Sequence, residues 1–271
     1  YIAKTAPFIE VTDNDKILNK VWRLNAPEAL QAIQKQMLDK KIFIADGHHR
    51  YEVGSMYREE MRDKLGKITG EEDFNYILAY FTNVESKGLT ILPCNRLVCG
   101  VSDEDIKKLK DQIKDYFDVE QVKDKTKFFL MMEKAGKRQH AIGIYTGKTF
   151  YFVRLKNPRI MDSLIPDKPK EYRMLDVCIL NHVLLSKILG VDFNDKDKIR
   201  FIPDPDETIR WADENAGCVG FLLNPVKVEE MVSVALTGER MPPKTTYFYP
   251  KVLSGLLINK FNQDNENAPV R

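Results

Sequence analysis

The sequence predicts an α+β fold in which helices pack against a mixed sheet. Apolar residues recur every three or four positions in some segments and form short runs in others, which are the patterns of helices and strands. These segments are interspersed without the regular strand–helix repeat of a doubly wound sheet. With 271 residues, 43% of them hydrophobic, the chain can bury a sizeable core in one large domain or two modest ones.

The first hundred residues combine helical and strand patterns. Pro27 suits the first turn of a helix. The apolar run before Asp46 leads directly into a helical pattern, which predicts a strand, a tight turn and a helix. We expect that strand to pair with two strands further along. The predicted elements are helices at 13–20 and 27–40, a strand at 42–45, a helix from residue 48, and strands at 75–84 and 89–92.

The rest of the chain predicts a strand meander and further helices. Ser102 is a candidate N-cap, and Gly190 closes a long helix. His140 and His182 fall within a strand and a helix, so we expect them to serve in packing. The predicted elements are a helix at 102–116, strands at 127–132, 139–145 and 149–155, helices at 175–189 and 208–215, a strand at 218–223, a helix at 226–236, and a frayed tail at 262–271.

The charge distribution indicates no macromolecular partner. Lys and Arg number 42 and Asp and Glu 40, and both signs are scattered, so no segment has the basic stripe that DNA or an anionic membrane requires. No apolar stretch approaches the ~20 residues that cross a bilayer, and the opening residues lack a signal-peptide pattern. We therefore expect a cytoplasmic protein with a small-molecule substrate, without nucleic acid or membrane as partner.

The cysteines predict no disulfide. Cys94, Cys99, Cys178 and Cys218 contain no Cys-x-x-Cys pair. A chain of this length does not need disulfide staples to fold. We expect four reduced, mostly buried thiols.

The densest chemical signal is Asp-Gly-His-His-Arg at residues 46–50. A strand that delivers these residues to the first turn of a helix brings together free backbone N–H groups, the positive end of the helix dipole and a guanidinium. Asp46 is a good N-cap, Gly47 lets a ligand oxygen approach the backbone, and Arg50 can hold a phosphate with two hydrogen bonds. The pattern predicts a site for a nucleotide phosphate or a phosphorylated metabolite.

Two other interpretations of this motif stay open. The adjacent His48 and His49 point about 100° apart on a helix, whereas His48 and Glu52 have the i, i+4 spacing of metal ligands, but no third ligand can be named. Alternatively, Asp46, His49 and Arg50 form a structural polar network at the helix start. We favour phosphate binding and predict no metal held by protein side chains.

A second group of candidate residues lies in the strap at 238–251. Two adjacent prolines stiffen this segment, and cations, hydroxyls and aromatic side chains follow them closely. It either lines a site or packs over the core with solvated lysines. Arg96, at the end of a predicted strand, can meet a phosphate or a carboxylate, or lie at the surface. The candidate substrate contacts are Arg96, Lys244, Thr245, Thr246 and Lys251.

At residues 44–52, Ile-Ala-Asp-Gly-His-His-Arg-Tyr-Glu, the sequence resembles a bacterial and archaeal family catalogued as domain of unknown function 1015. The resemblance extends to residues 88–93, 175–177 and 241–251, and it covers most of the chain. The last of these motifs, Met-Pro-Pro-Lys-Thr-Thr-Tyr-Phe-Tyr-Pro-Lys, is long and unusual. One departure is Asn95, where members commonly have His before the Arg.

The Asp-Gly-His-His-Arg core also resembles the phosphate-binding motif of the ParB and sulfiredoxin superfamily, whose free-serine kinases phosphorylate L-serine. This resemblance implies a ParB/sulfiredoxin-like core at 1–100, incomplete at its N-terminus. A second α+β subdomain with the site-lining strap would follow at 101–258, and a tail at 259–271. The donor would be ATP or ADP, with Mg²⁺ held mainly by phosphates.

In those kinases the base resembles a glutamate upstream of the motif, which here would precede Tyr1. Asp46 and Glu52 are the substitutes within this chain. The hypothesis is a phosphotransferase for a small hydroxylated metabolite, with free serine as the candidate acceptor. The alternatives are a nucleotide hydrolase and a non-catalytic nucleotide-sensing module. The expected catalytic residues are Asp46, His48 and Glu52, and the expected phosphate contacts are Gly47, His48, His49 and Arg50.

Overall fold

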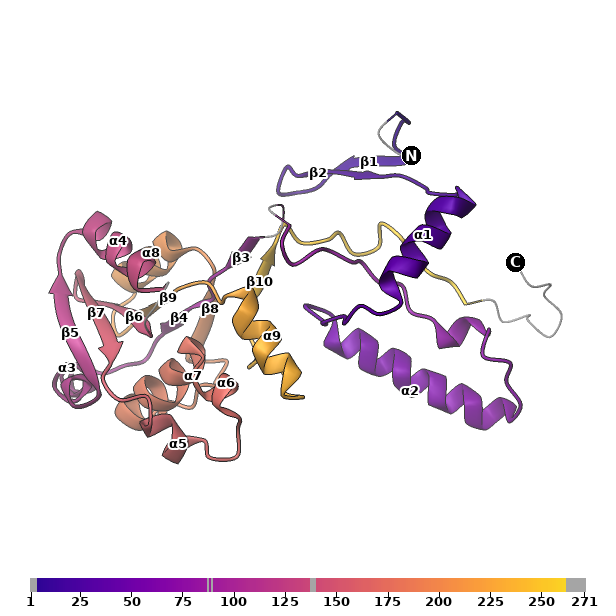
Figure 1. Cartoon of the computed structure of the whole chain (residues 1–271). Coiled ribbons are helices and arrows are strands. Elements are labelled where there is room, and N and C mark those ends of the chain that lie inside the picture. The colour runs from indigo at the N-terminus through magenta and orange to yellow at the C-terminus, as the bar shows by residue number, and fades with distance from the viewer. Residues whose placement is uncertain (1–3, 87, 89, 137–139, 262–271) are drawn as a thin grey trace. The chain divides into compact units, whose positions relative to one another are not determined.

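The structure is a computed structural model that describes residues 4–86, 88, 90–136 and 140–261. The chain divides into two compact units, residues 1–83 with 250–271 and residues 84–249 (Figure 1). This division differs from the expected one at residue 100. Residues 84–100 join the second unit because they contain a strand of its main sheet, and the strap is divided at residue 249.

A six-stranded antiparallel sheet forms the centre of the second unit. Its order is β5 (Phe117–Val122), β7 (Thr149–Leu155), β6 (Ala141–Thr146), β9 (Val219–Leu223), β4 (Asn95–Val98) and β8 (Ile199–Ile202). Each pairing in this sheet is antiparallel, for example Ile144 opposite Phe221 and Arg96 opposite Phe201. Antiparallel strands with helices packed on them confirm the α+β class.

Helices cover both faces of this sheet. On one face, α4 and α8 pack through side chains such as Phe128 and Ala212, and the opposite face carries α3, α7 and a π-helix (Figure 1). The predicted cap of α3 is confirmed, because the Ser102 Oγ accepts a hydrogen bond from the Asp105 N–H at 3.1 Å. The helices of the described residues in this unit are α3 (Asp103–Tyr116), α4 (Lys125–Gly136), α5 (Ile160–Leu164), α6 (Lys170–Arg173), α7 (Asp176–Ile179), the π-helix Leu180–Leu189, α8 (Pro205–Glu214) and α9 (Val228–Leu236).

The described residues of the first unit form a hairpin, two helices and a short 3₁₀ turn. Strands β1 (Ile9–Thr12) and β2 (Leu18–Val21) pair antiparallel, and α1 (Pro27–Met37), α2 (His48–Leu65) and the turn Asp73–Asn75 follow. The predicted helix at 13–20 is wrong. The Asp13 carboxylate accepts a hydrogen bond from the Ile17 N–H at 2.8 Å, so the side chain stabilises a turn in place of a helix.

Three predicted strands are also wrong. The structure has no strand at 42–45 or 75–84, because these segments have no pairing partner in the described chain, and an unpaired strand leaves its backbone groups unsatisfied. Residues 127–132 belong to α4. The buried residues Phe128 and Met132 are four positions apart, which is a helical period.

The strap provides the partner of the predicted strand at 89–92, which the structure has as β3 (Thr90–Leu92). Strand β10 (Tyr247–Tyr249) pairs antiparallel with β3, with Phe248 opposite Ile91. Residues 87, 89, 139 and 262–271, which fall in the predicted turn, two predicted strands and the tail, lie outside the described residues. No helix in the described part of the chain is long and apolar enough to span a membrane.

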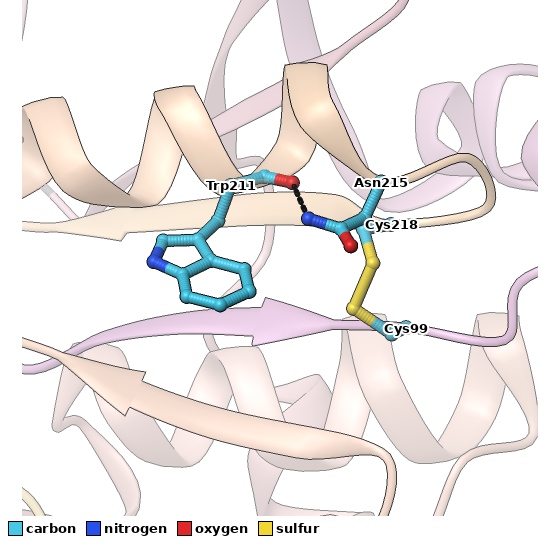
Figure 2. The surroundings of a disulfide bond; sticks show 4 residues. All are labelled: Cys99, Trp211, Asn215 and Cys218. Carbon is cyan, nitrogen blue, oxygen red and sulfur yellow. Dashed lines mark hydrogen bonds between the residues drawn. A yellow bond between two sulfur atoms is a disulfide. The ribbon is translucent and has the colours of Figure 1, made fainter.

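One disulfide joins Cys99 to Cys218, so the prediction of four reduced thiols is wrong for this pair (Figure 2). Val98 and Val219 are partners in the antiparallel β4–β9 pair. Cys99 and Cys218 occupy the next position of the same register, which sets them directly opposite each other. This register brings the sulfurs together although no Cys-x-x-Cys spacing announces it. Trp211 packs in the same small cluster. The prediction of buried thiols is confirmed for Cys94 and Cys178.

A partly buried ion pair links the residue just before β6 to the start of α7. The Nδ1 of His140 lies 2.9 Å from Oδ1 of Asp176. The hydrogen bond to Asp176 raises the pKa of His140, whereas burial raises the pKa of the Asp176 carboxyl. His140 therefore does more than the packing expected of it, because it joins the sheet to a helix electrostatically.

Reducing the disulfide should destabilise the second unit. A cross-link across 119 positions removes loop entropy from the unfolded chain, so we expect Cys99→Ser to lower the free energy of unfolding by about 2–4 kcal/mol. Urea unfolding with and without reductant measures this. The reductant should destabilise the wild type and leave Cys99→Ser unaffected, and an equal effect on both would contradict the prediction.

The stability of the second unit should fall as the pH rises past neutrality. Because the folded pKa of His140 is raised above its ordinary value of 6.5, its stabilisation is complete below that pH and is lost as the pH rises through the folded pKa. The difference in unfolding free energy between the wild type and His140→Gln should therefore be largest below pH 6.5 and shrink as the pH rises through the folded pKa of His140. Urea unfolding at several pH values measures it, and a constant difference would exclude this role.

Candidate functional site

Helix α2 begins at a glycine that no other residue replaces without strain. Gly47 precedes the helix with φ +83° and ψ 26°, in the left-handed region. The Tyr51 N–H donates to the Gly47 carbonyl at 3.0 Å, which is the first bond of the helix. The amide groups of residues 48–50 therefore have no acceptor within the helix. The predicted tight turn and the helix after it are confirmed.

The Arg50 side chain folds back over this glycine. A Cβ at Gly47 would lie 2.9 Å from Arg50 Nη2. Nη2 is 3.6 Å from an Asp46 carboxylate oxygen, and the side chains of Arg50 and Asp46 are 72% and 81% exposed. The guanidinium therefore lies at the open start of the helix, beside the unbonded amides. The prediction that Asp46 caps the helix is wrong, because Gly47 holds the cap position and Asp46 faces Arg50 instead.

The two histidines of the motif have different surroundings. His49 is 98% exposed, and its Nδ1 lies 3.3 Å from a Glu52 carboxylate oxygen. His48 is half-buried. Glu52 thus lies against His49, not in the His48–Glu52 pairing that a metal site would use. No group of three or more His, Cys, Asp or Glu side chains arranged to hold a metal ion occurs in the described residues.

The turn lies on an open surface. Among residues 4–83 and 250–261, Ala29 is the only buried residue. The motif is therefore not sealed beneath apolar side chains, and Arg50 is not locked into an internal carboxylate. The structural-network interpretation accounts for the contacts from Arg50 to Asp46 and from His49 to Glu52, but these are exposed ion pairs, and such pairs contribute little to stability.

The structure brings together part of the second predicted group. Arg96 in β4 is 1% exposed, and its Nη2 donates to the Lys244 carbonyl at 3.0 Å. Its Nη1 donates to the Cys94 carbonyl. Thr245 is buried and donates to the Pro242 carbonyl. The alternative that Arg96 lies at the surface is therefore excluded. The sequence did not predict the contact between Arg96 and the strap.

The remaining predicted substrate residues do not all join this group. Thr246 is half-buried in the second unit, and Lys251 is exposed and belongs to the first unit. Asn95 is buried and has a structural role, because its amide donates to the Pro203 carbonyl at 3.1 Å and its Oδ1 accepts from the Leu223 N–H at 3.0 Å. The signal that could have indicated these roles is a polar pair, Asn95 and Arg96, within an otherwise apolar strand.

The chain belongs to the family described as Protein of unknown function (DUF1015), which it matches over residues 1–178. The family that the motif at 44–52 indicated is thereby confirmed. Among curated proteins, none matches this chain.

Several solved structures share a weak likeness with the chain. A mutant free serine kinase in complex with ADP is 18% identical with a TM-score of 0.36, and covers 83% of this chain and 81% of its own. Another mutant of a free serine kinase, in complex with AMP, is 18% identical with a TM-score of 0.38 over 83% and 82%. A conserved hypothetical protein from Pyrococcus furiosus is 17% identical with a TM-score of 0.36 over 83% and 84%. Because these identities and TM-scores are low, the solved structures do not indicate the chemistry of the site, which is inferred from the residues of this chain.

Two glycines of the same region should respond to alanine in opposite directions. Gly47→Ala places a Cβ against Arg50 and forces a left-handed conformation, so we expect a loss of about 1–2 kcal/mol. Gly54→Ala, inside α2 with ordinary contact at 3.5 Å to Ile77, should gain about 0.5–1 kcal/mol. Circular dichroism during thermal unfolding measures both changes. Equal effects of the two substitutions would refute the strain at Gly47.

Proposed function

We propose that the first turn of α2 binds the terminal phosphates of ATP or ADP, and that the protein transfers a phosphoryl group to a small hydroxylated metabolite. Free L-serine is the specific acceptor that we propose. The observation that supports this most directly is the Arg50 guanidinium folded over Gly47 at an exposed helix start. Backbone amides, the helix dipole and a fixed cation together favour an oxyanion at this position.

The residues of the turn suit phosphate more closely than they suit a metal ion. Arg50 offers a planar fork that can make two parallel hydrogen bonds to a phosphate. The absence of a Cβ at Gly47 lets the Arg50 guanidinium lie against the backbone at the helix start. His48 and His49 add further donors on the same turn, and His49 is exposed enough to reach a ligand. The residues therefore fit a phosphate group.

The transfer needs a carboxylate near the bound phosphates. A bound nucleotide would supply the phosphoryl group, with Mg²⁺ held mainly by its phosphates. In the step itself, the acceptor hydroxyl oxygen forms a bond to phosphorus as the bond from phosphorus to the leaving oxygen breaks, and the hydroxyl proton passes to a base. We assign this proton to Asp46, whose carboxylate is 81% exposed beside Arg50, with Glu52 as the second candidate. Positioning supplies most of the rate enhancement.

Removing the guanidinium should abolish most nucleotide binding. A hydrogen bond to a charged group contributes about 1.5–3 kcal/mol, so Arg50→Gln should weaken ADP binding by about 10- to 100-fold. Isothermal titration calorimetry with ADP and Mg²⁺ measures this. Arg58→Gln is the matched control, because Arg58 lies on the same helix and pairs with Glu59. Equal affinities for the two variants would contradict the site.

The reaction products separate the three functions that share this site. Formation of phosphoserine from serine and nucleotide supports the kinase, and its loss in Asp46→Asn with binding retained supports the assigned base. Phosphate release without an added acceptor points to a hydrolase. Tight binding without either product points to a sensing module. Absence of nucleotide binding would overturn the proposal.

A further inference from the structure

We propose that Arg96 and Lys244 form a second anion site, built from other residues than those of the turn at Gly47, which takes a small oxyanion such as a phosphate or a carboxylate. The site lies within the second unit, where β4 meets the strap at residues 242–245. It goes beyond the proposed phosphotransferase, because it does not require a nucleotide to bind at α2.

The first argument is the charge of Arg96. A buried cation is costly unless it is paired with an opposite charge. Arg96 is 1% exposed and forms no ion pair with any carboxylate of the described chain. Two carbonyls accept from its guanidinium, and its Cζ lies 5.3 Å from the centroid of the Phe201 ring. These contacts are dipolar, so they leave the full positive charge without a counter-ion.

An unused donor marks the direction of the proposed ligand. The buried Arg96 Nε has no hydrogen-bond partner among the described residues. Buried donors in folded proteins are nearly always satisfied, so an orphaned N–H requires an explanation. A ligand oxygen provides both the missing acceptor and the missing negative charge.

Lys244 contributes the second cation. Its side chain is exposed, and its backbone is left-handed at φ 56°, a conformation that non-glycine residues adopt only at a cost. The hydrogen bond from Arg96 to the Lys244 carbonyl fixes this backbone, and the Thr245 hydroxyl fixes the turn through the Pro242 carbonyl. Contacts on both sides thus hold the strained backbone of Lys244, as expected where the position of a side chain must be fixed.

Both cations act on one buried group. Burial raises the pKa of the Cys94 thiol, and the positive charges of Arg96 and Lys244 oppose that rise. Burial also lowers the pKa of Arg96 to about 10, which leaves the guanidinium charged at neutral pH. Two positive charges that have no carboxylate partner among the described residues therefore act on Cys94, and an oxyanion bound by both would enter from the exposed Lys244 side.

Phosphate titration of the full chain in an Arg50→Gln background tests the site, because this substitution removes the main cation of the first turn. We expect saturable binding of inorganic phosphate by calorimetry at constant ionic strength, and at least a fivefold loss of affinity on adding Lys244→Gln. Lys148→Gln is the matched control, because Lys148 is also exposed, left-handed and within the second unit. It should change the affinity less than twofold. Both variants keep Arg96, so the core stays intact.

The phosphate titrations test the site at Arg96 and Lys244 independently of the proposed nucleotide site. Loss of phosphate binding in Lys244→Gln but not in Lys148→Gln supports the proposal, even where wild-type protein binds no nucleotide. Titration with acetate in place of phosphate then separates a carboxylate site from a phosphate site, and saturable binding of either anion that depends on Lys244 supports it. No saturable binding of either anion, or equal behaviour of the two lysine variants, would show that Arg96 is purely structural and overturn the inference.

Discussion

Strand β4 is the constraint on which the second unit depends, because its four residues are all buried and it lies between two other strands of the main sheet. The ladder joins it to β8 on one side and β9 on the other. The Asn95 side chain adds hydrogen bonds to Pro203, which follows β8, and to Leu223 in β9. Arg96 extends across 148 positions of sequence to the strap. The disulfide then fixes the end of the strand. A displacement of β4 would therefore disturb the sheet and the strap together.

The two proposed sites differ in how solvent treats their charges. Arg50 and Asp46 are mostly exposed, so water and salt screen their interaction, and a ligand there competes with solvent for the guanidinium. Arg96 is buried, so water and salt screen its positive charge much less. The free-energy cost of removing this charge from water is already incurred when the protein folds. Binding at the first site should depend more steeply on ionic strength than binding at the second.

Local signals in the sequence were sufficient for part of the fold and failed where pairing decides the structure. Helix α3 was predicted from Ser102 and the apolar period, and the β6–β7 hairpin from its turn, because both depend on neighbouring residues. The segment at 75–84 has a similar apolar composition but no strand partner, so composition alone misled. For the site, the motif predicted the start of α2 but placed the cap at Asp46, whereas the left-handed Gly47 holds it. The contact of Arg96 with Lys244 and the Cys99–Cys218 bond arise from register and long-range packing, which no spacing in the sequence encodes.

The bond between Cys99 and Cys218 turns most of the second unit into a covalent ring that contains β5 to β8 and α3 to α8. A protease that cuts one peptide bond within this ring releases no fragment, since both new ends remain attached through the two sulfurs. Such a nicked chain keeps its mass until a thiol is added. The ring thus gives this part of the protein a tolerance to single cuts that residues outside it do not share.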